Sequence, residues 1–228
     1  MRPASGSAPP PRVALTVDAE HPDGSRCRAG NDERILDALG EAGVRATFFL
    51  QGRWVTAHPQ LARAVAAQGH LIGNHSHHHV RMPLLSAAGL RADVLAAQGA
   101  IQEVVGVDPR PLFRTPFGTG RDDPAFDRSL ARLGYRNVLW DVDGADWEAD
   151  RGVGAVLERL VAGCLGGSGV RIALVHSWPD QTAAALPMML DRLRRAGTEF
   201  VTVDRLAPDL PGPAAGTGPA APSARCSS

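Results

Sequence analysis

The chain has 228 residues, an ordinary apolar fraction and no formal net charge, so it fits one domain or at most two. Without an excess of positive charge, we expect no nucleic-acid partner and no membrane partner, and no apolar run is long enough to span a bilayer. All 24 basic residues are arginine, which excludes a pyridoxal Schiff base, a lysine nucleophile and a P-loop lysine.

Two segments of low complexity flank the body of the chain. Residues 1–11 and 207–228 are rich in Pro, Ala, Gly and Ser, and this composition predicts disordered tails on either side of one domain at 12–206. The first segment lacks the apolar core of a signal peptide, so we expect a cytoplasmic protein. The three cysteines show no CxxC spacing, which argues against a disulfide framework or a cysteine zinc site.

Between the tails, short apolar runs alternate with helical patterns. The runs predict seven strands, at 13–17, 46–50, 71–73, 112–113, 137–140, 172–175 and 200–203. The helices expected between them are at 32–42, 59–68, 86–105, 124–133, 153–164 and 182–196. Such alternation predicts an α/β fold with a parallel sheet and crossover helices. Seven strands in this order favour a barrel over an open sheet, although periodicity does not decide closure.

Polar and aromatic residues follow most of these strands. Active sites of parallel α/β folds lie at the carboxyl ends of the strands, so these residues are candidates for a site. In chain order they are Asp18 and Glu20; His75 and His79; Arg114, Pro116 and Phe117; Asp141, Asp143, Asp146 and Trp147; and His176 and Trp178. Carboxylates, imidazoles, one guanidinium and aromatic rings are therefore expected at one rim.

Half of the eight histidines lie at 75–79. His75 and His79 are four residues apart, and one helical turn would place both imidazoles on the same face. That arrangement suits a divalent metal such as zinc. We expect His77 and His78 to face solvent.

The other histidines and the remaining tryptophans are expected to serve the structure. We expect a structural role for His70, surface loops for His21 and His58, and packing roles for Trp54 and Trp140.

Five segments, at 16–20, 75–79, 114–118, 143–147 and 174–176, occur in the order of the five motifs of a known family. The chain resembles a polysaccharide deacetylase of the NodB-homology type, carbohydrate esterase family 4, over residues 12–206. The resemblance implies a distorted (β/α) barrel of about seven parallel strands.

The first motif departs from the family pattern, which commonly has a second aspartate where this chain has Ala19. The chain resembles a branch with Asp-x-Glu or Asp-x-Asp instead. Residues i and i+2 of a strand point to the same side, so Asp18 and Glu20 can both face a pocket while Ala19 faces away. Asp18 and Asp23 remain alternatives to Glu20 as the carboxylate ligand. Asp23 ranks lower because it lies deeper in a polar loop.

The resemblance implies a role for each residue of the set. One divalent ion, zinc with cobalt or nickel as alternatives, would be held by Glu20, His75 and His79. The base would be Asp18, paired with Arg114. The acid would be His176, oriented by Asp146 and with a pKa near neutrality. The substrate would contact Phe117, Trp147, Leu174 and Trp178.

The implied reaction is removal of an N-acetyl group from an acetylated amino sugar, such as a chitooligosaccharide, a peptidoglycan strand or a smaller glycoside. The alternatives are an O-acetyl esterase, a hydrolase of non-sugar amides, and a catalytically silent metal- or glycan-binding protein. A serine hydrolase is disfavoured because the chain lacks a Gly-x-Ser-x-Gly elbow. The sequence does not indicate an oligomeric state.

Overall fold

A computed structural model describes residues 10–21, 28–167 and 169–206 of the chain. Residues 1–9 of the predicted tail at 1–11, the whole predicted tail at 207–228 and the alternative ligand Asp23 lie outside these ranges. No helix within them is long and apolar enough to cross a membrane.

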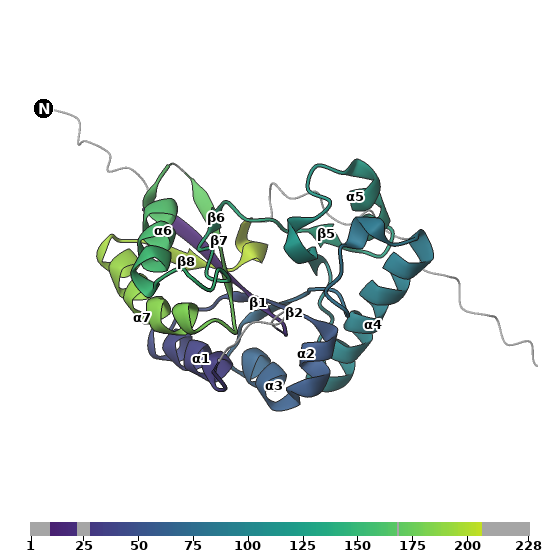
Figure 1. Ribbon diagram of the computed structural model, residues 1–228, viewed down its shortest axis with the longest axis horizontal. Helices are drawn as coiled ribbons and strands as arrows, with labels where there is room; N and C mark the ends of the chain where they lie inside the picture. Colours follow the sequence, from purple (N-terminus) through teal and green to yellow (C-terminus); the bar gives the residue numbers. More distant parts are fainter. Residues whose placement is uncertain (1–9, 22–27, 168, 207–228) are drawn as a thin grey trace, which may run out of the picture.

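One sheet of eight strands forms the centre of the fold, and all of its pairings are parallel. The order is β5-β4-β3-β2-β1-β7-β6, with β8 also paired to β1. Figure 1 shows the sheet curling into a half-barrel with helices around it. The strands are β1 Arg12–Ala19, β2 Thr47–Leu50, β3 Leu71–Asn74, β4 Leu112–Phe113, β5 Arg136–Asn137, β6 Val142–Asp143, β7 Val170–His176 and β8 Glu199–Val201.

The six predicted helices are confirmed, and α4 shows capping signals at both ends. Ser86 accepts a hydrogen bond from the Gly89 amide at the start of α4, and Gly106 ends that helix with a φ of 80°. A seventh, α2, was not predicted because six residues are too few to show a helical period. The helices are α1 Asn31–Glu41, α2 Gly52–Ala57, α3 Pro59–Ala67, α4 Ala87–Val105, α5 Pro124–Ala131, α6 Val153–Leu165 and α7 Asp180–Arg195.

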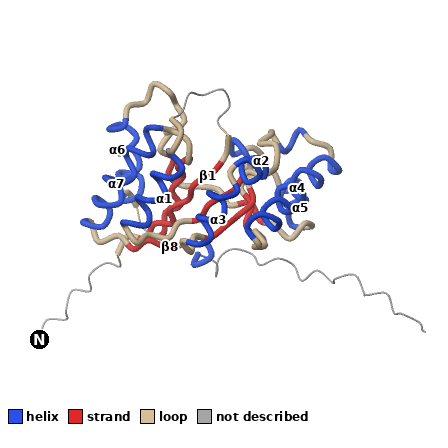
Figure 2. The backbone as a smooth tube through the Cα atoms, turned by 90° about the horizontal axis from the view of Figure 1, so that it is seen from below, coloured by secondary structure: helices blue, strands red, loops and turns tan. Residues whose placement is uncertain are grey.

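Strand β1 separates the helix-covered core from the interior of the half-barrel. Its odd-numbered residues, Val13 to Ala19, pack in the large apolar cluster beneath the helices, whereas Ala14 belongs to the cluster inside the curl. Figure 2 shows the helices outside the strands. Because side chains alternate along a strand, Thr16 and Asp18 also face inward. The prediction that Ala19 points away from Asp18 and Glu20 is therefore confirmed.

The predicted strand at 137–140 is wrong. These residues link β5 to β6, and the segment changes partners in its middle. The Val138 amide donates to the Phe113 carbonyl beside β4, whereas the Asp141 amide donates to the Ile172 carbonyl of β7. The segment thus crosses between the two ends of the curled sheet. The expected strand shares only Asn137 with β5, and β6 was not predicted. The predicted barrel class is confirmed.

His70 has the structural role expected of it. Its Nδ1 accepts a hydrogen bond of 3.2 Å from the Ala46 amide, and its ring centroid lies 4.9 Å from that of Phe48. Burial lowers the pKa of His70 to about 4, and the charge of Arg45 acts in the same direction. The imidazole is therefore neutral in the folded protein at neutral pH.

His21 and His58 are more buried than surface-loop residues would be. Both are partly buried, and their ring centroids are 5.5 Å apart. Trp54 is buried in the core as predicted, and its ring centroid lies 5.6 Å from that of His58. The pair of histidines therefore packs over the end of α2 instead of facing solvent as separate loop residues.

The low pKa of His70 makes the stability of the protein depend on pH. The unfolded chain takes up this proton near pH 6.5 and the folded chain only near pH 4, so His70 contributes stability that is lost as the pH falls between these values. In His70→Gln, the glutamine side chain can still accept a hydrogen bond from the Ala46 amide, but it has no group that titrates. We expect the free energy of unfolding of the variant to decline less steeply from pH 6.5 to 4 in denaturant titrations. Parallel slopes for both proteins would contradict this assignment.

Candidate active site

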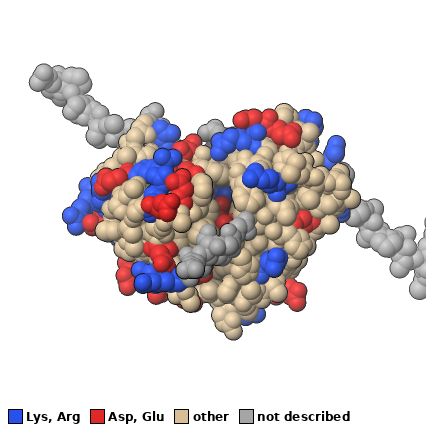
Figure 3. All heavy atoms as spheres, viewed as in Figure 1, with Lys and Arg blue, Asp and Glu red and all other residues tan. Residues whose placement is uncertain are grey.

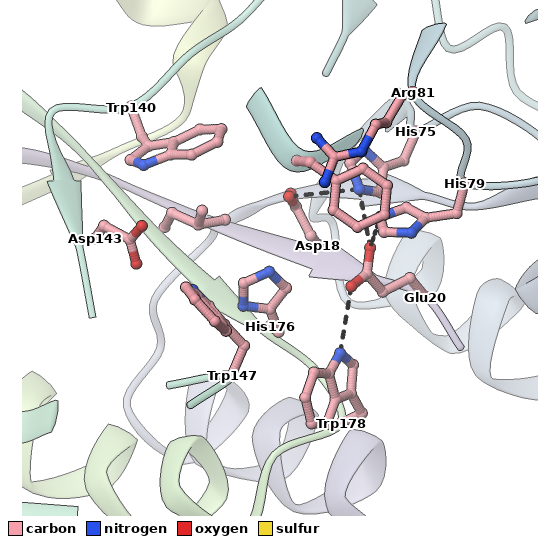
Figure 4. A pocket seen from close by; sticks show the side chains of 12 residues that line it. Asp18, Glu20, His75, His79, Arg81, Trp140, Asp143, Trp147, His176 and Trp178 are labelled. Carbon is pink, nitrogen blue, oxygen red and sulfur yellow. Dashed lines mark hydrogen bonds and ion pairs between the residues drawn. The ribbon is translucent and has the colours of Figure 1, made fainter. Parts of the chain in front are cut away.

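A pocket of about 480 Å³ opens at the carboxyl ends of the strands, within the size range of small-molecule sites. Figure 4 shows side chains from distant parts of the chain facing this space. The predicted residues that line it are Asp18, Glu20, His75, His79, Phe117, Trp147, Leu174, His176 and Trp178. Arg114 and Asp146 lie behind this lining, in contact with Asp18 and His176. The structure therefore brings together most of the candidates at the rim; Pro116 and Asp141 do not line the pocket, and Asp141 Oδ2 instead accepts a hydrogen bond from the Ile172 amide.

The histidine segment after β3 is a loop, so the predicted helical turn is wrong. Ser76 and His79 have positive φ angles of 63° and 55°, which is uncommon for residues other than glycine. This left-handed backbone reverses the chain and returns His79 to His75, with ring centroids 5.1 Å apart. The two imidazoles meet as expected, but through a strained loop.

Asp93 on α4 holds this loop in place. Its Oδ1 accepts the His77 amide at 2.8 Å, and its Oδ2 accepts the His78 amide at 3.1 Å. Within the loop, the Ser76 hydroxyl accepts the His79 amide at 2.9 Å. His77 and His78 thus contribute backbone donors to the loop, and neither belongs to the ligand cluster. His78 is exposed as predicted, whereas His77 is partly buried.

Three ligand atoms converge in this buried corner. Glu20 Oε2 lies 3.0 Å from His75 Nε2 and 2.6 Å from His79 Nε2, and all three lie within 4.8 Å of one another. His75 Nδ1 is 2.8 Å from the Arg114 carbonyl oxygen, which can only accept, so Nδ1 carries the proton and Nε2 faces Glu20.

The convergence fits a cation. Burial by itself would raise the pKa of Glu20, but hydrogen bonds from His75 and His79 hold it well below its ordinary value. At 3.0 Å and 2.6 Å from the two imidazole nitrogens, the Glu20 carboxylate is placed to share a proton or a metal ion with them. One carboxylate oxygen and two imidazole nitrogens form a donor set that suits zinc and similar divalent ions.

A fully buried guanidinium lies behind Asp18. Arg114 Nη1 donates to Asp18 Oδ1 at 2.9 Å and to the Thr16 hydroxyl at 2.7 Å, and its Nε donates to the Val138 carbonyl at 3.0 Å. The other oxygen, Asp18 Oδ2, lies 3.6 Å from His75 Nε2. The ion pair thus leaves one carboxylate oxygen facing the ligand cluster.

A second charged pair lies across the pocket. Asp146 Oδ1 accepts from His176 Nδ1 at 2.8 Å, while its Oδ2 accepts the His176 amide at 2.7 Å and the Thr182 hydroxyl. Burial would lower the pKa of His176, but Asp146 outweighs this and raises it to about 10. The expectation of a pKa near neutrality is therefore wrong: in the protein alone, His176 is protonated at neutral pH.

Aromatic rings form the open side of the pocket. Phe117 and Trp147 are each 50% exposed, and the Trp178 indole donates to Glu20 Oε1 at 3.3 Å. Trp140 was expected only to pack in the structure, but its ring also lines the pocket. The cause is the crossing segment between β5 and β6, which turns Trp140 toward the site.

Two further residues of the lining had no role assigned from the sequence, Arg81 and Asp143. Asp143 belongs to the fourth motif, so its motif position was a usable signal. Arg81 follows His79 by two residues, but spacing alone does not show that the loop turns it over the pocket.

A curled parallel half-barrel of this kind matches the NodB deacetylase barrel. Residues 5–138, more than half of the chain, match the family model for polysaccharide deacetylase. The chain therefore belongs to the polysaccharide deacetylase family.

Two relatives illustrate the sequence similarity. The chain is 33% identical to the peptidoglycan-N-acetylglucosamine deacetylase PgdA of Listeria monocytogenes over 86% of its own length, and it spans 38% of the length of that relative. It is 35% identical to a chitooligosaccharide deacetylase of Sinorhizobium fredii, covering 72% of this chain and 79% of the relative.

Two solved structures share the fold. A family 4 carbohydrate esterase from Streptomyces lividans in complex with acetate has a TM-score of 0.73 and 30% identity, covering 86% of this chain and 94% of that one. A pseudoenzyme of the same family from Bacillus anthracis has a TM-score of 0.75 and 26% identity, covering 86% and 65%. The fold therefore occurs in both an esterase and a pseudoenzyme.

The role of Asp93 can be tested by Asp93→Asn. The amide has one oxygen, so one part-buried N–H of the histidine loop loses its acceptor, at a cost of about 1 kcal/mol. We expect this loss in the free energy of unfolding, with faster hydrogen exchange at the amides of His77 and His78. Asp37→Asn, on the exposed face of α1, is the control and should change the free energy by less than about 0.5 kcal/mol. Equal effects of the two substitutions would exclude a specific role for Asp93.

Proposed function

We propose that the protein is a metal-dependent hydrolase that removes the N-acetyl group from an acetylated amino sugar. The observation that carries the proposal is the convergence of Glu20, His75 and His79 in a pocket that Asp18 and His176 also face. A ligand cluster, a carboxylate and a protonated imidazole are the groups that hydrolysis of an amide requires.

The proposed metal ligands are Glu20, His75 and His79, with zinc as the first candidate and cobalt or nickel as alternatives. When bound, a divalent ion would lower the pKa of a water molecule and polarise the acetyl carbonyl. The Arg114 carbonyl fixes the His75 ring, so the position of Nε2 does not depend on the ion.

Asp18 is the proposed base. Arg114 occupies Oδ1, so Oδ2, on the side of His75, remains to accept a proton from the attacking water. Because the guanidinium is fully buried, it holds the carboxylate in one orientation throughout the reaction.

His176 is the proposed acid. Asp146 engages Nδ1, so Nε2 is the nitrogen that can deliver a proton to the leaving amine. The raised pKa, about 10, keeps this proton on the ring until the amine forms. Asp146 is in turn held by the Thr182 hydroxyl and the His176 amide, which prevents its rotation.

The acetyl group and sugar ring would contact Phe117, Trp147, Leu174 and Trp178, with Trp140 added by the structure. Apolar rings around a polar centre suit a hexosamine, whose ring faces are apolar. The names of the two relatives support peptidoglycan or chitooligosaccharide as the substrate class. O-acetyl esters and non-sugar amides are the alternative substrates of the same catalytic set.

A catalytically silent metal- or glycan-binding protein is the second candidate. Ala19 stands where the family pattern has an aspartate, and one structural neighbour is a pseudoenzyme. The buried convergence of Glu20 with the two histidines argues against this candidate, because Glu20 supplies the carboxylate that Ala19 lacks.

Substitutions separate the two kinds of role. Glu20→Ala and His79→Ala are expected to lose metal and turnover together. Asp18→Asn and His176→Ala are expected to retain metal while turnover falls about 10²–10⁴-fold. Metal content after dialysis, acetate release and a thermal unfolding scan are measured on each variant. Glu41→Gln, an exposed carboxylate on α1, is the control. A metal-replete but inactive Glu20→Ala would refute the ligand assignment.

The substrate class is tested by acetate release from chitooligosaccharides, peptidoglycan fragments and acetylated xylan, with zinc- or cobalt-loaded protein. We expect release from at least one of the two N-acetylated substrates, none from xylan, and loss of activity after chelation. Release from xylan alone would favour the esterase. Bound metal without release from any of the three would favour the silent protein.

A further inference from the structure

Arg81 lies at the end of the pocket that holds the ligand cluster. Its Cζ is 5.1 Å from the centroid of the Phe117 ring, which in turn is 4.5 Å from the centroid of the His79 ring. Figure 4 shows the guanidinium on the same side as His75 and His79, across the pocket from Asp143. A positive charge is therefore held close to the proposed reaction centre.

This charge has no acidic partner within the described part of the chain. The nearby carboxylates are engaged elsewhere, since Asp18 is paired with Arg114 and Glu20 with two histidines. The Phe117 ring supports the guanidinium from one side but offers no hydrogen-bond acceptor. Arg81 is exposed, so its N–H donors face the pocket mouth and solvent.

An arginine in this position is suited to a charged ligand. A guanidinium binds a carboxylate or phosphate through two parallel hydrogen bonds, a geometry that a neutral N-acetylhexosamine does not offer. The formal net charge of the chain is zero, so the protein as a whole does not attract anions. Attraction of an anion to this pocket therefore depends on the position of Arg81. Asp18 is matched by the charge of Arg114, and Asp143 lies across the pocket, so neither carboxylate neutralises the charge of Arg81.

We propose that Arg81 forms an anion subsite, and that the pocket takes an amino sugar with a carboxylate or phosphate group close to its acetamido group. The closeness follows from the packing of Arg81, Phe117 and His79 against one another. The inference rests on the proposed function, because it places the anion relative to the acetyl group that the enzyme removes. The competing explanation is a solvated arginine that only supports Phe117.

The test measures binding without turnover. The zinc-loaded protein is titrated with three amino sugars that lack the acetyl group, so that nothing is hydrolysed: glucosamine, muramic acid with its carboxylate on a C3 substituent, and glucosamine 1-phosphate with its phosphate on C1. We expect one anionic ligand to bind about tenfold more tightly than glucosamine, as a charge-assisted hydrogen bond implies. The ligand that shows this preference identifies the source of the anion.

Variants assign the preference to Arg81. The preference is expressed as the dissociation constant of the neutral ligand divided by that of the anionic ligand. Arg81→Gln is expected to reduce this ratio to about one. Arg81→Lys is expected to retain part of the preference because the positive charge remains. The control is Arg121→Gln, an exposed arginine whose Cζ lies 5.5 Å from the Trp140 ring centroid. It should leave the ratio unchanged. No preference in the natural protein, or a preference that survives Arg81→Gln, would overturn the proposal.

Acetate release from neutral chitooligosaccharides is measured in parallel. An anion preference without acetate release from any substrate would refute the hydrolase and leave the subsite standing. Acetate release without an anion preference would refute the anion subsite and leave the hydrolase standing. The two failures are therefore distinguishable.

Discussion

The buried guanidinium of Arg114 is the interaction on which the site depends. Its side chain joins the Asp18 carboxylate on β1 to the Val138 carbonyl on the crossing segment, and its own carbonyl orients the His75 ring. One residue thus connects the proposed base, a proposed metal ligand and the wall of the half-barrel. Removing one partner of such a buried pair leaves an uncompensated charge, at a cost of about 3–5 kcal/mol.

The site balances its charges locally in a chain with no formal net charge. Asp18 is matched by Arg114, and Asp146 by His176, each through a short buried contact. Figure 3 shows acidic and basic side chains intermixed on the face that it presents.

The crossing segment between β5 and β6 accounts for several differences from expectation. A two-residue strand has too few positions to show alternation, so the sequence pattern extended β5 to Trp140 and missed β6. Trp140 was expected to have a packing role, whereas the change of partner turns this ring toward the pocket. Long elements with clear periods, such as α4 and β1, were predicted within a few residues of their observed ends.

The sequence by itself determined the parallel α/β class, the carboxyl-end rim and the pairing of Asp18 with Glu20 on one side of a strand, because side-chain period and strand order are local properties. The tertiary structure decided how the histidines meet, since Asp93 from a distant helix holds a left-handed loop. It also decided the protonation of His176, because the pKa of a buried group depends on neighbours such as Asp146, thirty positions away. The position of Arg81 over Phe117 is likewise a contact between separate loops, which spacing along the chain does not encode.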